Sequence, residues 1–554
     1  MILAYRATEK TEARKVANQP PPIAPHNVFE CDTPMAEALE REVLAAGGEP
    51  DEGVERVRDA GALAGSPEAR DHSERCERNQ PILRTHDRYG NRIDEVDLDP
   101  SWHWLLRQAI ERGIHSLPWH DPQPGAHTVR AALMYTWSQV NAGVMCPVSM
   151  TYSVIPALRE SPELSREWEP RLVRQDYGDG ALAGMAMTEK QGGSDVRANA
   201  TRAEPQSDGS WEITGHKWFC SYPPCDVFLM LAHAPAGLSC FLVEGRDPGF
   251  QIQRLKDKLG TRSLPSAEIE LAKARGRLVG VEGRGVPTII RMVNHTRLDC
   301  LIGSAASMRL GTVQAVHHAR HRFAFGRALV DQPAMQNVLA DLAVESEAAT
   351  AAAMRIARAY DESSTSPAPG PFRRLATAVM KYWVCKRAPG HAVEALECLG
   401  GNGYVEESGM PRLLRDSPLN SIWEGSGNVA ALDVLRAMAR EPEGLPAFLA
   451  EVERAGGADP RLDAHVARVK ERAGWLASAD GDPRRAGCEA QWAARGLVED
   501  LGLALQGSLL VRNAPAAVAD AFCAARLAGD RGHAFGTLPR GVDAAAIIDR
   551  ALAG

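Results

Sequence analysis

Residues 421–428 read Ser-Ile-Trp-Glu-Gly-Ser-Gly-Asn and place one carboxylate, Glu424, between bulky apolar residues and a run of small ones. Apolar residues then recur at helical spacing, at Val429, Leu432, Leu435 and Met438. This spacing predicts a helix that begins near Ser426, with the Ser426 hydroxyl as its N-cap. Burial beside Trp423 would raise the pKa of the Glu424 carboxyl group, whereas the helix end would lower it. Both a general base and a simple helix cap therefore remain open.

A second candidate is the run Met-Ala-Met-Thr-Glu-Lys-Gln-Gly-Gly-Ser-Asp-Val at residues 185–196. Glycines and hydroxyl groups let backbone amides come close to a flat heterocycle or a phosphate. The same Gly-Gly-Ser-Asp sequence is also typical of an ordinary turn. The other motifs of the chain have to decide between a binding loop and a turn.

Composition excludes several classes of function. The chain has 554 residues, 44% of them hydrophobic and 24% charged, which is typical of a globular protein with several structural units. A formal charge of −8 offers no general attraction to nucleic acid or anionic membranes. No apolar run approaches the ~20 residues of a membrane span, and no secretory signal is recognisable, so we expect a cytoplasmic protein. Eleven scattered cysteines at no zinc-binding spacing predict reduced core thiols and no metal site.

Periodicity predicts helical parts around one β-rich part. An extended Pro-rich arm at residues 1–30 is followed by a helical domain at 31–181. Short β-branched and aromatic runs, separated by Gly, Pro and Asp, predict a compact β domain at 182–286. Amphipathic stretches at 287–324, 332–360 and 372–399 predict a second helical domain at 287–440, and an Ala-rich tail at 441–554 predicts a third. We therefore expect an α+β fold that is mainly α.

Six motifs in sequence order resemble those of the acyl-CoA dehydrogenase family. They lie at residues 185–196, 215–221, 258–263, 322–326, 399–404 and 424–426. The unbroken Met-Thr-Glu-Lys-Gln-Gly-Gly-Ser-Asp-Val and Asn-Ser-Ile-Trp-Glu-Gly-Ser-Gly-Asn, together with the tail, are similar to the AidB, or alkylation-response, branch of that family. The resemblance implies the acyl-CoA dehydrogenase-like fold of N-terminal helical, middle β and helical bundle domains, with an appended C-terminal helical domain.

The resemblance also implies a noncovalently bound FAD. By motif position, the residues expected to contact it are Met185, Met187, Thr188, Gly193, Ser194, Phe219, Ser221, Phe325, Gly401, Trp423, Ser426 and Asn428. Arg322 would reach the FAD of a neighbouring subunit, which requires a homo-oligomer, in this family usually a tetramer. Without the resemblance, Arg322 is equally an ordinary cation at a helix end and Phe219 an ordinary β core residue.

Glu424 occupies the position of the family's catalytic base. That base removes a proton from the carbon next to a thioester carbonyl while hydride leaves the next carbon for the flavin. Arg297 matches the family's arginine on the thioester side, although Asn294 stands where many members have Asp. The resemblance therefore implies an acyl-CoA substrate for this site.

Two classes of function remain open. The AidB branch implies an FAD protein of the DNA alkylation response that associates with duplex DNA and has weak acyl-CoA dehydrogenase activity, with Arg436 and Arg531 as candidate DNA contacts. DNA binding predicts a basic surface. Residues 441–554 instead hold 13 Lys and Arg against 16 Asp and Glu, a balance of −3, and both arginines are equally suited to ion pairs at helix ends. The alternatives are a genuine acyl-CoA dehydrogenase and an oxygen-using acyl-CoA oxidase.

Overall fold

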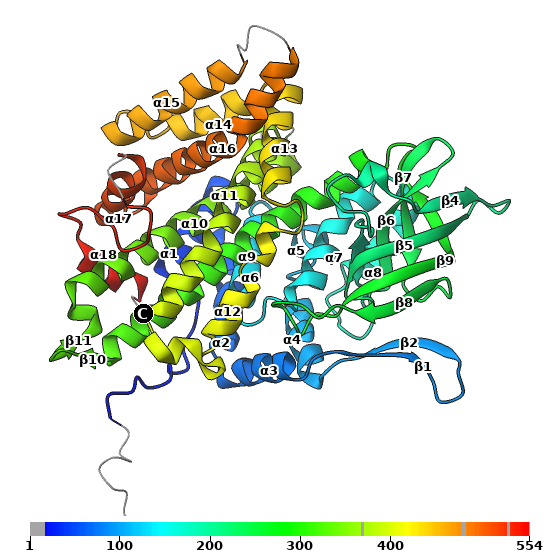
Figure 1. Cartoon of the computed structure of the whole chain (residues 1–554), viewed down its shortest axis with the longest axis horizontal. Helices are drawn as coiled ribbons and strands as arrows, with labels where there is room; N and C mark the ends of the chain where they lie inside the picture. The colour runs from blue at the N-terminus through cyan, green and yellow to red at the C-terminus, as the bar shows by residue number, and fades with distance from the viewer. Residues whose placement is uncertain (1–16, 367–369, 478–482, 529–531, 553–554) are drawn as a thin grey trace, which may run out of the picture.

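The computed structural model describes residues 17–366, 370–477, 483–528 and 532–552. A β domain lies at one end of the molecule, long helices form its centre, and the helices of the C-terminal tail cover another side (Figure 1). The predicted DNA contact Arg531 lies outside the described residues.

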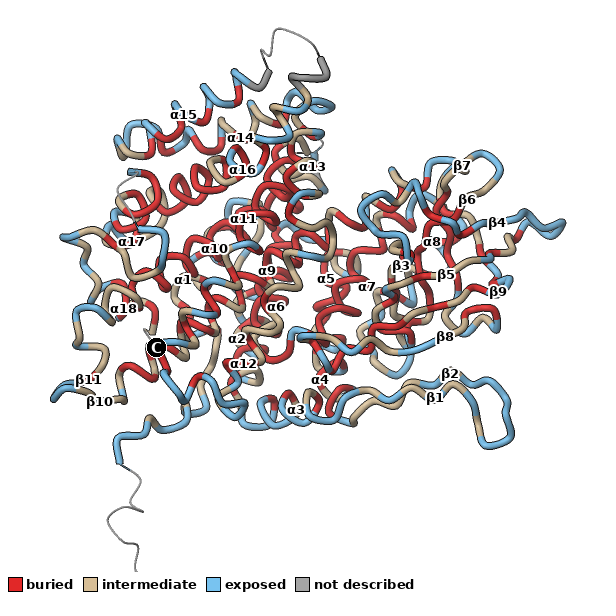
Figure 2. The backbone as a smooth tube through the Cα atoms, in the orientation of Figure 1, coloured by how far each residue is buried: buried red, intermediate tan, exposed pale blue. Residues whose placement is uncertain are grey.

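The N-terminal part combines short helices with one hairpin. The helices are α1 (Thr33–Ala45), α2 (Pro50–Ala64), α3 (Pro67–Arg78), α4 (Pro100–Glu111), α5 (Leu117–His120), α6 (Ala126–Ser138), α7 (Met145–Leu158) and α8 (Pro162–Leu172). The hairpin of β1 (Ile82–His86) and β2 (Arg92–Asp97) was not expected in this helical part. Its turn is closed by Asp87, whose carboxylate accepts the N–H groups of Tyr89 and Asn91 at 2.8 and 2.9 Å. Its strands are largely exposed or half-buried (Figure 2), so they lack the apolar alternation by which strands are predicted.

The middle part is a sheet that closes on itself. Its strands are β3 (Ala183–Ala186), β4 (Arg202–Pro205), β5 (Trp211–Ser221), β6 (Val227–Ala234), β7 (Gly237–Glu244), β8 (Phe250–Leu255) and β9 (Ser266–Val279). Strands β6, β4, β5, β9 and β7 pair in that order, and β7 pairs back with β6. The pairing of β5 with β9 slips between Lys217 and Cys220. Such a bulge turns side chains away from their regular direction, and here it involves Trp218 and Phe219.

Long helices form the centre of the molecule. Helices α9 (Gly285–His321), α10 (Pro333–Thr365) and α11 (Gly370–Glu397) pack on one another, and α9 also packs on α6 and α7. A small hairpin of β10 (Phe323–Ala324) and β11 (Arg327–Ala328) joins α9 to α10. After α11 follow a 3-10 turn, η4 (Gly400–Tyr404), then α12 (Met410–Asp416) and α13 (Gly427–Arg440). Most residues of α9 to α11 are buried (Figure 2).

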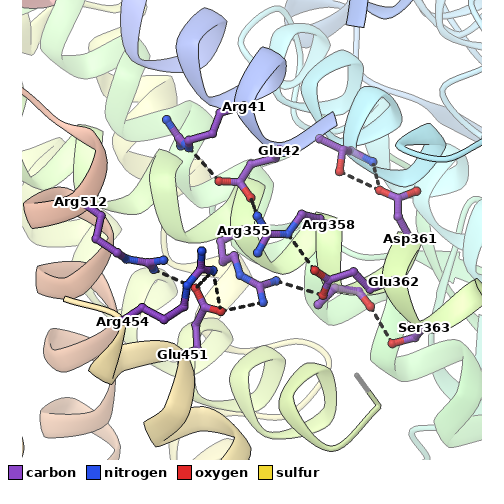
Figure 3. Close-up of polar contacts among 12 residues, drawn as sticks. Arg41, Glu42, Arg355, Arg358, Asp361, Glu362, Ser363, Glu451, Arg454 and Arg512 are labelled. Carbon is purple, nitrogen blue, oxygen red and sulfur yellow. Dashed lines mark hydrogen bonds and ion pairs between the residues drawn. The ribbon is translucent and has the colours of Figure 1, made fainter. Parts of the chain in front are cut away.

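The tail packs on this centre. It comprises α14 (Gly444–Glu453), α15 (Pro460–Ala477), α16 (Pro483–Asn513), α17 (Ala516–Phe522), a π-helical turn (Cys523–Leu527) and α18 (Ala544–Ala551). Glu451 of α14 binds both Arg355 of α10 and Arg512 of α16, at 3.0 and 2.8 Å (Figure 3). The tail is thus attached through buried charges and does not form a spatially separate unit. Within the described ranges, no helix is long and apolar enough to cross a membrane.

Candidate active site

Two buried cations hold the loop that carries Glu424. Lys381 of α11 donates to the carbonyl oxygens of Trp423 and Gly425 at 2.8 and 2.5 Å. Arg297 of α9 donates to the carbonyl oxygen of Glu424 at 3.0 Å and pairs with Asp433 of α13 at 2.6 Å. The φ angles of 58° at Glu424 and 102° at Gly425 give the loop the shape in which these three successive carbonyls meet the cations.

The Glu424 carboxylate is buried, and its hydrogen bonds within the described residues do not replace all those that water would make. Its Oε2 atom is shielded from solvent and has no hydrogen-bond partner among the described residues. Burial raises the pKa of Glu424, whereas the Thr296 hydroxyl group and the charges of Lys381 and Arg297 lower it. An unpartnered oxygen of this kind can accept a proton, which favours a base.

Ser426 occupies the N-cap position of α13, as predicted, but its hydroxyl makes no capping hydrogen bond. The prediction of a side-chain cap is therefore wrong. The loop is held instead through the carbonyl groups that Lys381 and Arg297 bind. Since neither Ser426 nor Glu424 caps the helix, the structure does not support the simple cap that the sequence left open for Glu424.

A buried ion pair joins the first two predicted flavin motifs. Glu189 binds Lys217 at 2.8 Å, and both side chains are inaccessible to solvent. Glu189 also accepts the N–H group of Ala200 at 2.6 Å. Burial alone would raise the pKa of Glu189, but Lys217 and these hydrogen bonds lower it to about 2. The Trp218 N–H group donates to the Thr188 carbonyl at 2.8 Å, so the loop after β3 is fastened to β5.

The residues of this loop and of β5 fit a flat cofactor. A Cβ atom at Gly193 would lie 2.3 Å from the Thr188 hydroxyl oxygen, so only glycine allows this close approach. Phe219 is 48% exposed, because it lies at the bulge of β5, and is therefore not the ordinary core residue that the sequence left open. Met185, Met187 and Ser221 are half-buried, and Ser194 is exposed. Apolar and hydroxyl side chains that remain accessible around a glycine loop suit FAD.

The Cys146 thiol is affected both by Ser221 of the flavin strand and by Glu424, the candidate base. The thiol lies at the start of α7 and is buried. Burial and, to a smaller extent, the charge of Glu424 raise its pKa to about 12, against the opposing effects of Lys258 and the Ser221 hydroxyl. Ser221 of the flavin strand and the Glu424 carboxylate thus act on the same thiol. Trp423, Ser426 and Asn428 belong to the same region through the Glu424 loop and the start of α13.

Three predicted cofactor residues lie elsewhere. Arg322 and Phe325 belong to the segment around β10 and β11, which lies at the opposite end of the view from β5 (Figure 1). Phe325 is 98% exposed, and Arg322 donates to the Asn18 carbonyl oxygen. Gly401 lies in η4, where neighbouring Asn402 donates to Gln19 at 3.0 Å. The N-terminal arm thus ties these segments together, and they do not join Glu424 within one chain.

The remaining predicted residues are held in ion pairs or lie outside the structure. Arg297 is 5% exposed and engaged with Asp433 and the Glu424 carbonyl, so its contact with substrate stays a prediction. Arg436 pairs with Asp433 at 3.1 Å on an exposed face of α13. Among the described residues, no group of three or more His, Cys, Asp or Glu side chains could hold a metal ion.

Sequence reasoning missed Lys381. The only signal available was a lone lysine within the apolar helical stretch Ala-Val-Met-Lys-Tyr-Trp at residues 378–383. Its partners are carbonyl groups some 40 residues further along the chain, which no side-chain pattern reveals. Thr296, which faces Glu424 from α9, was missed for the same reason.

Family comparisons agree with this fold. The family model described as the adaptive response protein AidB N-terminal domain matches residues 18–179. The middle and C-terminal domains of acyl-CoA dehydrogenase match residues 184–274 and 283–439. The chain therefore belongs to the acyl-CoA dehydrogenase family, whose members are FAD-dependent oxidoreductases acting on acyl-CoA thioesters, and the predicted family and fold are confirmed.

Individual relatives indicate to which branch of the family the chain is most similar. The Escherichia coli protein named putative acyl-CoA dehydrogenase AidB is 39% identical over 83% of this chain and 87% of its own length. Acyl-CoA dehydrogenase family member 11 of Caenorhabditis elegans is 33% identical over 72% of this chain and 68% of its own. The solved structure of C. elegans ACDH-11 in complex with C11-CoA matches with a TM-score of 0.83 and 27% identity, covering 100% of this chain and 95% of that one. These matches indicate the AidB branch of the family.

Proposed function

We propose that this protein binds FAD and removes hydrogen from the α and β carbons of an acyl-CoA thioester, with Glu424 as the base. The observation that carries the proposal is the buried, unpartnered carboxylate oxygen of Glu424 in a loop held by Lys381 and Arg297. Family membership supports the reaction, and the C11-CoA complex of the C. elegans relative supports an acyl-CoA substrate.

Bound FAD supplies the hydride acceptor in such a reaction. Glu424 would take the α-proton on its carboxylate, and its buried surroundings exclude water from that oxygen. Met185, Met187, Thr188, Gly193, Ser194, Phe219 and Ser221 would hold the flavin end of the cofactor, together with Trp423, Ser426 and Asn428. Arg297 would act on the substrate side only indirectly, since its guanidinium is already bonded to the base loop and to Asp433.

Arg322, Phe325 and Gly401 would complete the site of a second copy. This interpretation follows from the β10–β11 hairpin, which lies at the opposite end of the view from β5 (Figure 1), and from the N-terminal arm, which contacts both Arg322 and the neighbour of Gly401, Asn402. A symmetric homo-oligomer brings such an end against the flavin site of its partner. The predicted tetramer is one assembly of this kind.

Anaerobic reduction tests the proposed reaction. We expect at least one thioester from a panel of acyl-CoAs to bleach the flavin of the purified protein, and Glu424→Gln to abolish bleaching while FAD stays bound. Burial raises the pKa of Glu424 above its ordinary 4.5. As the pH is lowered, we therefore expect the rate of bleaching to start falling while the pH is still above 4.5. Bleaching by Glu424→Gln at the rate of the unaltered protein would exclude Glu424 as the base. Rapid oxygen consumption by the reduced flavin would favour the oxidase alternative.

Association with duplex DNA in an alkylation response is a second proposal. The match to the adaptive response AidB family model supports it. Electrostatics oppose it, because the tail cations Arg461, Arg472 and Arg526 pair with carboxylates of the same chain. A titration of duplex DNA across a salt series separates the two views, since phosphate contacts give affinity that falls steeply with salt. The cytoplasmic location also stays a prediction.

A further inference from the structure

Lys381 is a buried cation whose partners are backbone carbonyl groups. Its side chain lies in the middle of α11 and is 1% exposed. Its ammonium group donates to the carbonyl oxygens of Trp423 and Gly425. Removing an ammonium group from water is costly unless nearby charges and dipoles compensate it. The loop around Glu424 supplies the dipoles, and the Glu424 carboxylate is the nearby charge on which Lys381 acts.

Arg297 differs from Lys381 in this respect. Arg297 pairs with Asp433 at 2.6 Å, and Asp433 also binds Arg374 at 2.9 Å. Arg297 is thus held on a carboxylate that it shares with Arg374 and Arg436. Lys381 forms no such ion pair within the described part of the chain, so its charge remains available to Glu424.

The other groups that face Glu424 do not replace Lys381. From α9, Asp299 is engaged in a buried ion pair with Arg130, and Thr296 offers a neutral hydroxyl. Cys146 from α7 and Cys300 from α9 stay neutral, because burial raises the pKa of both thiols. Lys381 and Arg297 can both offset the negative charge of an ionised Glu424, and Lys381 on α11 is the one of the two that has no carboxylate partner among the described residues.

We propose that Lys381 is a positioning residue for the Glu424 base. It holds the carbonyl groups on both sides of Glu424, which keeps the carboxylate in place, and its charge favours the ionised form that accepts a proton. The inference rests on the proposed function, because only a base has to be ionised before it reacts.

Three variants of the FAD-loaded protein separate the two parts of this role. Lys381→Met removes donors and charge, Lys381→Gln keeps a donor without the charge, and Lys381→Arg keeps both. We expect the midpoint of the pH dependence of bleaching to rise in Lys381→Met and Lys381→Gln, and to stay near that of the unaltered protein in Lys381→Arg. Each unit of pKa increase lowers the rate about tenfold on the acid side of the midpoint. FAD content should not change.

Hydrogen exchange reports on the loop without any reaction. Peptides that cover residues 421–427 should exchange faster in Lys381→Met than in Lys381→Arg, because the carbonyl contacts are lost. Arg387→Met is a matched control, since Arg387 lies on the same helix but pairs with Glu345 at 3.0 Å. It should lower stability without changing the pH midpoint or the exchange of residues 421–427.

The outcomes distinguish this inference from the proposed function. An unchanged midpoint and unchanged loop exchange in Lys381→Met would overturn the positioning role, and an unchanged midpoint in Lys381→Gln alone would overturn its electrostatic part. If no acyl-CoA bleaches the flavin, the pKa of Glu424 can be followed by infrared titration, with Glu424→Gln to assign the carboxyl band. A pKa that rises in Lys381→Gln would then support the role of Lys381 although the proposed reaction had failed.

Discussion

Glu424 adopts a backbone conformation that residues with a side chain rarely take. Its φ angle is 58°, and Gly425 follows at 102°. A non-glycine residue in this region costs on the order of 1–2 kcal/mol. The hydrogen bonds from Lys381 and Arg297 to three successive carbonyls offset that cost. The backbone at the candidate base is thus strained, and hydrogen bonds hold it in that strained conformation. Such strain is typical of residues whose position matters for chemistry.

Gly193 offers a direct test of the flavin loop. In Gly193→Ala the new Cβ atom would lie 2.3 Å from the Thr188 hydroxyl oxygen and displace that side chain. Loss of one buried hydrogen bond to the cofactor costs about 1–3 kcal/mol, so we expect FAD affinity to fall roughly 10-fold or more. Fluorescence titration of apoprotein with FAD measures this change. Gly474→Ala is the control, because a Cβ atom at Gly474 would meet no other atom within 4 Å, and equal affinities in both variants would contradict the assignment.

The candidate site could be predicted where side-chain type carries the signal. Glu424 stands alone between apolar and small residues, and Gly193 follows Gly192 and precedes the hydroxyl residue Ser194. Lys381 could not be predicted, because its contacts are to backbone carbonyls brought near only by the fold. The separation of Gly401 from Glu424 likewise depends on where η4 lies in three dimensions.

At the scale of elements, the long helices were predictable because many apolar residues repeat along them. Helix α9 begins at Gly285 and α11 ends at Glu397, within a few residues of the predicted stretches. The β1–β2 hairpin could not be predicted, since its charged strands have no apolar face. The attachment of the tail to the central helices could not be predicted either, because it depends on ion pairs between residues far apart in the chain (Figure 3).

Glu451 is the test of that attachment. Burial alone would raise the pKa of Glu451, but Arg355 and Arg512 lower it to about 2 from an ordinary 4.5. A carboxyl group with a lowered folded-state pKa stabilises the fold above 4.5, and this contribution disappears as the pH falls toward 2. We expect Glu451→Gln to lower the free energy of unfolding by about 3–5 kcal/mol at neutral pH, because buried Arg355 and half-buried Arg512 lose their shared partner.

Urea denaturation at several pH values measures this loss. The difference between the unaltered protein and Glu451→Gln should shrink as the pH is lowered below 4.5. Glu453→Gln is the control, since Glu453 forms an exposed pair with Lys470 that is worth no more than about 1 kcal/mol. Equal effects of the two substitutions would show that the buried network does not hold the tail.

At the scale of the whole molecule, the predicted cofactor residues form two separate groups. Gly193, Phe219 and Glu424 belong to one group, whereas Arg322 and Gly401 lie on segments that the N-terminal arm ties together elsewhere. The β10–β11 hairpin lies at the opposite end of the view from β5 (Figure 1). In the proposed homo-oligomer, a complete site would take one group from each of two copies of the chain.

Complementation between two inactive variants tests this division. We expect Glu424→Gln and Arg322→Ala each to lack activity alone, the second through loss of FAD. When both are co-expressed with different tags and purified as hybrids, one site combines an intact Glu424 from one copy with an intact Arg322 from the other, so activity should partly return. Hybrids of Glu424→Gln with Gly193→Ala should show no gain over the activity of Gly193→Ala alone, because both residues belong to the same half of the site. Inactive hybrids in the first pairing would mean that Arg322 and Glu424 serve the same chain.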